Sequence, residues 1–212
     1  MLEPDRRALL VDALRPPAGM VFDHAIGTTF TLDLNALLIA PVAFALFELE
    51  RDNRAEAEEG ALRIDPIALL EAVRRHADRI DLFCQAGEIR LPPKYQPILT
   101  QLEDSIHPVS APQGGIFHPK VWAIRFADLE SGAFRHRLLC MSRNLTFDRS
   151  WDVILQLEEE AAAQRGGPTE ELARFVEALP PMAVTPMSED RVELIRQMAD
   201  GLRRAGFSLP ER

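Results

Sequence analysis

Three strand-forming segments lie close together in the second half of the chain, and they constrain its fold more than any other feature. Residues 116–126, 137–141 and 152–157 are rich in apolar, β-branched and aromatic side chains. Such closely spaced segments predict neighbouring strands of one sheet. Helical patterns surround them at residues 2–14, 33–50, 67–76, 169–179 and 189–205. The order of these strands and helices along the chain predicts an α/β sandwich with a mixed central sheet and helices on both faces.

The first half of the chain adds two more strands. Residues 26–31 predict the first strand, and the apolar run at 80–84 predicts a buried one. Asp65 and Pro66 form a helix-start signal, because an aspartate caps the first turn and proline suits its first position. Pro92 and Pro93 open a loop or short helix that ends near residue 102.

Composition and charge limit the classes of protein to which the chain can belong. The 212 residues are 47% hydrophobic and 27% charged, which is a normal globular balance. No apolar run reaches the roughly 20 residues of a membrane helix, and no secretory signal is visible, so we expect a cytoplasmic protein without a membrane partner. Cys84 and Cys140 are too few and too far apart for a disulfide framework, which predicts two buried thiols and no metal site.

The charge is unevenly distributed. A net charge of −9 argues against a protein covered in non-specific nucleic-acid contacts. Residues 118–149 nevertheless carry six basic and three acidic side chains. This basic stretch is either part of a nucleic-acid site or a chance cluster on a solvated hairpin.

His118 and Lys120 are the first candidates for chemistry. Residues two apart on a strand face the same side, so the imidazole and the ammonium are predicted to project together. A neutral imidazole can attack phosphorus, and an ammonium offsets phosphate charge. The alternative is a pair of ordinary surface residues on a strand.

A second candidate group follows the apolar segment 137–141. Ser142 and Asn144 come directly after it, where a hydroxyl and an amide can donate to a phosphoryl oxygen. The alternative is a strand-ending turn in which both side chains bond to their own backbone.

Together these segments resemble the phospholipase D-like superfamily. Its signature is His-x-Lys followed by Asp and then Gly-Ser-x-Asn after a strand, and His118, Lys120, Ser142 and Asn144 match it. The continuation Leu145-Thr146 is similar to the Asn-Leu-Thr of nuclease-type members. Three features depart from the signature: Arg125 stands where Asp is common, Met141 replaces Gly, and the hairpin at 127–136 is longer.

The resemblance implies metal-independent phosphodiester cleavage without a cofactor. It implies His118 as nucleophile or general acid, with Lys120 and Asn144 binding phosphate. The implied substrate contacts are Ser142, Arg143, Thr146 and Asp152, of which Asp152 would orient a histidine. In this family two His-x-Lys motifs meet, whereas this chain carries one. We therefore expect a second half-site from a homodimer partner or from a missing C-terminal half.

The resemblance also implies a domain division and a substrate. It implies a phospholipase D-like domain at residues 21–180, a helical extension at 1–20, and a C-terminal helix at 181–212, with continuation into a missing second half as one alternative. The Asn-Leu-Thr ending and the basic stretch favour DNA or RNA, and related proteins are associated with bacterial defence. Two alternatives stay open: a non-catalytic module that binds nucleic acid or protein, and a phosphodiesterase acting on phospholipid.

Four other residues are assigned to packing or to the surface. His24 is predicted to have a capping or core role, and His136 to be exposed on a hairpin. Trp122 and Trp151 are predicted to pack in the core or an interface, with a pocket-lining role as the alternative for Trp151.

Overall fold

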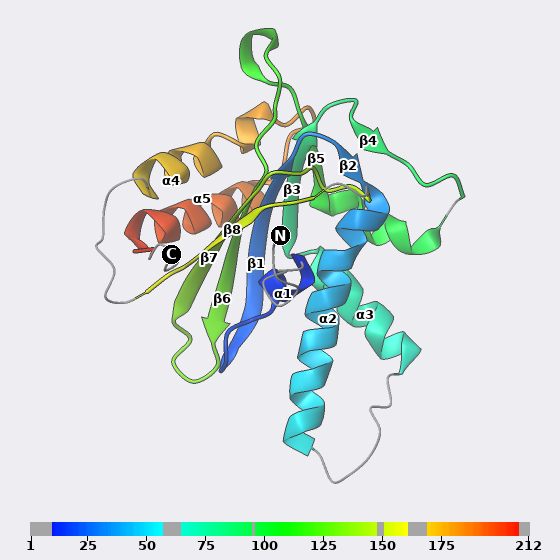
Figure 1. Ribbon diagram of the computed structural model, residues 1–212, viewed down its shortest axis with the longest axis vertical. Coiled ribbons are helices and arrows are strands. Elements are labelled where there is room, and N and C mark those ends of the chain that lie inside the picture. Colours follow the sequence, from blue (N-terminus) through cyan, green and yellow to red (C-terminus); the bar gives the residue numbers. More distant parts are fainter. Residues whose placement is uncertain (1–9, 57–64, 95, 148–150, 161–168, 208–212) are drawn as a thin grey trace.

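A six-stranded mixed sheet forms the centre of the molecule (Figure 1). The structure is a computed structural model, and it describes residues 10–56, 65–94, 96–147, 151–160 and 169–207. The strand order is β5-β3-β1-β6-β7-β8. The strands β1, β3 and β5 run parallel to one another, while β6, β7 and β8 alternate in direction from β1 onward. The predicted α/β class with a mixed sheet is confirmed.

The elements follow one another in an order that places the parallel strands first. The first half contains α1 (Leu10–Leu14), β1 (Met20–Thr29), β2 (Leu32–Asp33), α2 (Leu34–Glu56), α3 (Pro66–Ala77), β3 (Ile80–Gln85) and β4 (Ile89–Arg90). The second half contains the 3₁₀ helix η2 (Pro97–Ser105), β5 (Ile106–Val109), η3 (Pro112–Gly114), β6 (Val121–Asp128), β7 (Phe134–Met141), β8 (Ile154–Glu158), α4 (Thr169–Glu177), η4 (Pro180–Met182) and α5 (Glu189–Arg204).

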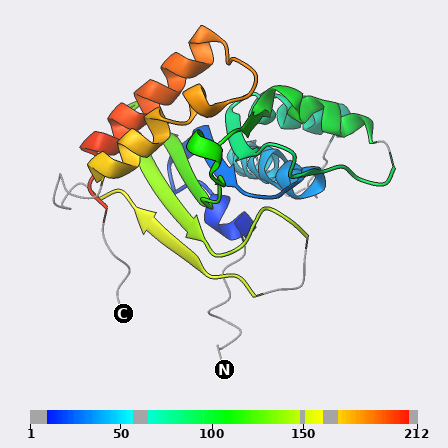
Figure 2. The same cartoon turned by 90° about the horizontal axis from the view of Figure 1, so that it is seen from above.

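Helices cover both faces of the sheet, and each face has its own apolar core (Figure 2). On one face α1 and α2 pack against the strands, where Leu37 and Phe44 meet Trp122 in a single buried cluster. On the other face α4 and α5 bury Val176 and Met198 against a second cluster. The helices α1 and α5 lie outside residues 21–180, and both contribute to these cores. The predicted domain division stays a prediction.

Most predicted elements are present, with shifted ends. Asp65 caps α3, since its Oδ1 accepts a hydrogen bond of 2.9 Å from the Ile67 amide. The strands β2, β4 and β5 were not predicted, because each has four residues or fewer. The strand expected from residue 116 begins only at Val121, and Pro119, which has no N–H to donate to a ladder, lies in the preceding segment. Residues 2–9 of the expected first helix lie outside the described residues.

Three predictions of burial are wrong. His136 is buried against Glu159, with its Nδ1 2.7 Å from the carboxylate, because β7 starts earlier than expected and includes it. Cys140 is exposed, because it lies on the outer part of β7 beside the edge strand. Trp151 is 74% exposed, because it precedes β8 and does not enter either core, so core packing is wrong for it. An interface or pocket-lining role of Trp151 stays a prediction. The predicted burial of His24, Cys84 and Trp122 is confirmed. In the part of the chain that the structure describes, no helix is long and apolar enough to cross a membrane.

Candidate phosphodiester site

The matched residues gather at one edge of the sheet. The parallel strand β1 ends there, and its antiparallel neighbour β6 begins there, with Gly27 paired to Trp122. The strand β7 ends at the same edge, where the Met141 amide donates a hydrogen bond of 2.8 Å to the Lys120 carbonyl. Because β8 pairs with β7 from Met141 onward, the segment before β8 also lies at this edge. Segments distant in sequence are thus brought together by the strand directions alone.

His118 and Lys120 project together as predicted, although both lie just before the strand. Lys120 Nζ is 3.0 Å from His118 Nδ1 and 3.3 Å from His118 Nε2. An ammonium on the in-plane lone pair of Nδ1 would be much farther from Nε2, so the two similar distances place Nζ over the face of the ring. The ring itself is exposed to solvent, and its other neighbour is Phe30, with ring centroids 5.0 Å apart. A phosphorus atom can therefore approach an imidazole nitrogen beside a positive charge.

Lys120 is held more deeply than His118. Its side chain packs inward, which leaves the residue 9% exposed. Burial lowers the pKa of the Lys120 ammonium from its ordinary value, since the charged form loses hydration. A partly desolvated ammonium interacts more strongly with a phosphate than one in bulk water does.

Ser142 and Asp152 contact each other. Asp152 Oδ1 accepts hydrogen bonds from the Ser142 hydroxyl at 2.7 Å and from the Ser142 and Arg143 amides at 3.1 Å. The Ser142 hydroxyl in turn accepts one of 2.9 Å from the Val153 amide. Among the described residues, no histidine contacts Asp152. These two side chains therefore join the end of β7 to the start of β8, and the Ser142 hydroxyl bonds to this neighbouring segment and not to its own backbone.

Asn144 lies within a short loop that is tied to β1 and β2. Its Oδ1 is buried and has no hydrogen-bond partner among the described residues. The Thr146 amide donates to the Asn144 carbonyl at 2.9 Å, and Arg143 Nη2 donates to the Thr146 carbonyl at 3.4 Å. Arg143 and Thr146 thus lie in the same loop as Asn144 and help to close it.

The two substituted positions of the signature are both buried. Arg125 forms an ion pair with Asp23 at 2.5 Å and lies over the ring of Phe134, on the part of β6 far from the edge that carries Lys120. Met141 packs into the core with α2, where the signature has a glycine. Neither substitution blocks the space around His118.

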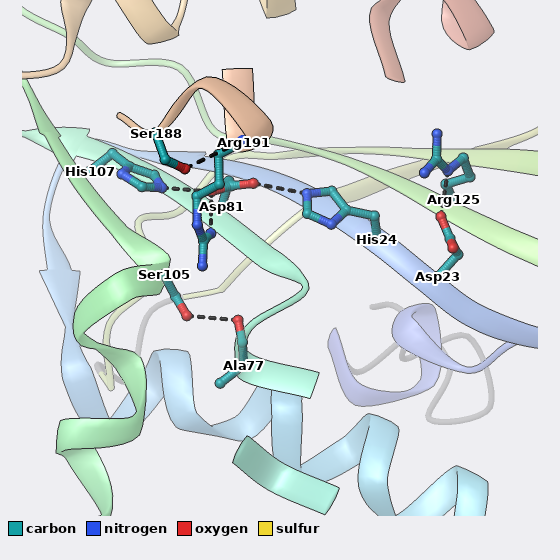
Figure 3. Close-up of polar contacts among 9 residues, drawn as sticks. All are labelled: Asp23, His24, Ala77, Asp81, Ser105, His107, Arg125, Ser188 and Arg191. Carbon is teal, nitrogen blue, oxygen red and sulfur yellow. Dashed lines mark hydrogen bonds and ion pairs between the residues drawn. The ribbon is translucent and has the colours of Figure 1, made fainter. Parts of the chain in front are cut away.

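A second polar cluster lies away from this edge, beneath α5 (Figure 3). Asp81 is fully buried and accepts hydrogen bonds from His107 at 2.6 Å, Arg191 at 2.6 Å and His24 at 2.9 Å. Burial alone would raise the pKa of the Asp81 carboxyl, but the bonds from His107 and His24 and the charge of Arg191 outweigh it. The pKa is therefore held well below its usual range. The cluster connects β1, β3, β5 and α5.

Sequence reasoning missed this cluster and the β1 residues at the site. An aspartate inside the apolar strand Ile80–Gln85 was the available signal for the cluster, since a buried carboxylate needs partners. No comparable signal marked Thr28, Thr29 or Phe30, because their role depends on strand pairing across almost a hundred residues or more.

Other possible sites lie elsewhere. A cavity of about 670 Å³ lined by Phe22, Phe44 and Arg79 contains none of the matched residues. Within the described ranges, no group of three or more histidine, cysteine, aspartate or glutamate side chains could hold a metal ion. The candidate site therefore rests on the exposed His118 and its neighbours at the end of β1.

Comparison with known proteins gives a distant structural similarity. No family model matches the chain, and no curated protein matches it. A crystal structure of a mutant yeast tyrosyl-DNA phosphodiesterase is similar over 87% of this chain, with 12% sequence identity and a TM-score of 0.44. The match covers 34% of that protein, so this chain spans about a third of its length.

Proposed function

We propose that this chain is half of a metal-independent phosphodiesterase that cleaves DNA or RNA through a phosphohistidine intermediate. The observation that supports this most is the exposed His118 ring with the Lys120 ammonium over its face. The Asn144 loop at the same edge supports it further. An imidazole with an adjacent fixed cation is suited to attack a phosphorus atom and to stabilise the charge that develops on it.

The proposed reaction has two displacements. A nitrogen of His118 forms a bond to phosphorus, the bond from phosphorus to the leaving oxygen breaks, and a second imidazole gives that oxygen a proton. Water then attacks the phosphohistidine, loses a proton to the second imidazole, and releases His118. Lys120 and Asn144 bind the phosphoryl oxygens, and Arg143 and Thr146 shape the loop. Ser142 and Asp152 do not bind the phosphate themselves; their mutual hydrogen bond holds the start of that loop in position.

A second imidazole must come from outside this half-site. Within the chain, only His118 has a lysine two residues later. The open edge around His118 leaves room for a facing half-site. We propose that a second copy of the chain, or a further segment of a longer protein, supplies it. A cytoplasmic location stays a prediction from the sequence, and a role in defence stays a prediction of the family resemblance.

Cleavage of DNA and RNA in the presence of EDTA tests the proposal. We expect the intact chain to cleave at least one of them and His118→Ala to abolish cleavage. Acid-labile, base-stable label should be trapped on His118 from a ³²P-labelled substrate. Ile116→Ala is the matched control, because Ile116 is exposed in the same segment and has no role in the reaction. Cleavage that is absent in EDTA, or unchanged by His118→Ala, would contradict the enzyme proposal.

A non-catalytic binding module is the second candidate. It is favoured by Arg125, which replaces an acidic residue of the signature and is paired with Asp23. Binding of an oligonucleotide without cleavage, with affinity that falls in Lys120→Met, would support this candidate. Cleavage of a phospholipid but not of nucleic acid in EDTA would instead support the phospholipase alternative.

A further inference from the structure

Three consecutive residues at the end of β1 contact both halves of the candidate site. Thr28 contacts the segment that follows Lys120, Thr29 contacts the segment that follows Asn144, and Phe30 lies against His118. Thr28 and Thr29 are each about 1% exposed. Neither threonine belongs to the segments that resemble a known signature.

Thr28 replaces the missing backbone pairing at the start of β6. The ladder between β1 and β6 ends at Gly27 and Trp122, one residue before Val121 would pair. On the other side of β1, the backbone pairing with β3 continues through Thr28. The Thr28 hydroxyl accepts a hydrogen bond of 2.9 Å from the Val121 amide and donates one of 3.2 Å to the Val121 carbonyl. Val121 follows Lys120 directly, so the hydroxyl fixes the backbone from which the ammonium projects.

Thr29 fixes the backbone of the loop that contains Asn144. Its hydroxyl accepts a hydrogen bond of 2.9 Å from the Leu145 amide and donates one of 2.9 Å to the Thr31 carbonyl. The Leu145 carbonyl then accepts a bond of 2.9 Å from the Asp33 amide. Leu145, which directly follows Asn144, is thereby held through both its amide and its carbonyl.

The other side of His118 is fixed by the neighbouring parallel strand. The Phe117 amide donates a hydrogen bond of 2.8 Å to Gln85 Oε1, at the end of β3. His118 and Lys120 are therefore bounded by Phe117 and Val121, whose amides both bond to side chains of the parallel strands. The end of β1, through Thr28 and Thr29, thus sets the distance between the segment that carries Lys120 and the loop that carries Asn144.

We infer that Thr28 and Thr29 are positioning residues, whose buried hydroxyls hold Lys120 and Asn144 on one phosphate. This inference rests on the proposed function, and neither threonine touches the substrate. Small displacements of groups around a reacting centre have large effects on rate, up to about 100-fold for 1 Å. Loss of one hydroxyl should therefore lower kcat, with a smaller effect on KM.

Four variants of the intact chain test the inference. Thr28→Val and Thr29→Val each remove a hydroxyl at nearly constant volume, Thr29→Ser retains it, and Thr31→Val is the matched control. Thr31 is also buried, but its hydroxyl lies 3.4 Å from Glu88 and contacts neither half of the site. We expect kcat to fall about 10- to 100-fold in the two valine variants at 28 and 29. Thr29→Ser should restore most of it, and Thr31→Val should change it little.

Two measurements that do not need turnover separate this inference from the proposed function. Tungstate, a phosphate analogue, should bind Thr29→Val about tenfold more weakly than the unaltered chain. Hydrogen exchange should show loss of protection at the Leu145 amide in the same variant. If the unaltered chain cleaves nothing but these two differences appear, the proposed function fails and the positioning role stands.

Three results would overturn the inference. The first is equal kcat and tungstate affinity in Thr29→Val and the unaltered chain. The second is an equal loss in Thr31→Val, which would show a general loss of stability. The third is a failure of Thr29→Ser to restore activity, which would exclude the hydroxyl as the cause. Absence of both cleavage and tungstate binding in the unaltered chain would reject the inference together with the proposed function.

Discussion

Asp81 Oδ2 accepts a hydrogen bond from His24 at 2.9 Å, and this pair joins β1 to β3 in the interior beneath α5. The other carboxylate oxygen meets His107 and Arg191. Since Asp81 is fully buried, all of its hydration has been replaced by these three donors. Removal of its charge therefore leaves an uncompensated guanidinium close to the sheet.

Asp81→Asn should destabilise the fold by about 3–5 kcal/mol at neutral pH, the usual cost of breaking a buried ion pair. The pKa of Asp81 is lower in the folded protein than the ordinary 3.8 of the unfolded chain. Its contribution to stability is therefore complete above pH 3.8 and is lost progressively as pH falls from there toward the folded pKa. Urea unfolding at pH 7 and pH 3 measures this. The difference in free energy of unfolding between the unaltered chain and Asp81→Asn should be smaller at pH 3 than at pH 7. An equal difference at both pH values would show that the Asp81 charge does not stabilise the fold.

Lys120→Arg should change the alkaline limb of the pH profile of the proposed reaction. The lowered pKa of Lys120 means that its charge is lost at a lower pH than for an ordinary lysine. Activity should therefore fall with rising pH below the usual lysine range. Arginine stays charged throughout this pH range. The loss of activity at alkaline pH should therefore disappear in Lys120→Arg, even if its rate at neutral pH is lower. Initial rates measured across this pH range test the prediction. If Lys120→Arg loses activity at the same alkaline pH as the unaltered chain, the titrating group is not Lys120.

Ser142→Ala and Asp152→Asn should lose the same interaction. Each variant breaks the contact between the end of β7 and the start of β8, so each should lower stability by about 1–2 kcal/mol. The double variant should cost clearly less than their sum, by about 1 kcal/mol. Urea unfolding of all four proteins gives this coupling energy.

A similar pair provides the control for this cycle. Ser131 donates to Asp128 at 2.8 Å in the turn between β6 and β7, far from the site. Ser131→Ala should lower stability without lowering cleavage, whereas Ser142→Ala should lower both. Strict additivity at 142 and 152 would show that the two side chains act independently.

Trp151 should report the binding of single-stranded nucleic acid. It precedes Asp152 and is 74% exposed, while the only other tryptophan, Trp122, is 0% exposed. Bases stack on exposed aromatic side chains, and stacking quenches indole emission. Fluorescence should therefore fall as a short oligonucleotide is added, and the change should be absent in Trp151→Phe. A signal that persists in Trp151→Phe would have to come from Trp122, which would mean a change in the core.

The sheet could be predicted from sequence because its longer strands carry strong apolar patterns. The pairing of His118 with Lys120 could also be predicted, since a separation of two residues fixes a common side in extended backbone. His136 was misassigned to the surface because charged neighbours suggested a hairpin. In the structure its ring lies against Gly201, where an added Cβ would come within 2.5 Å of His136 Nε2. That contact requires knowledge of where α5 packs.

The remaining site residues depend on tertiary pairing. Asp152 was expected to orient a histidine, but its position beside Ser142 follows from the path of the chain between β7 and β8. Thr28 and Thr29 are unremarkable in a strand, because β-branched residues are common there. Their importance comes from Val121 and Leu145, which lie 93 and 116 residues away.

The hydrogen bond between Thr29 and Leu145 also has a consequence for folding. Contacts between residues so far apart in sequence form late, because the entropy of closing a long loop must first be overcome. In a chain whose residue 145 has not yet reached β1, Thr29 cannot hold the loop that contains Asn144. Such a chain has no assembled candidate site, so the proposed activity is restricted to molecules whose sheet has closed.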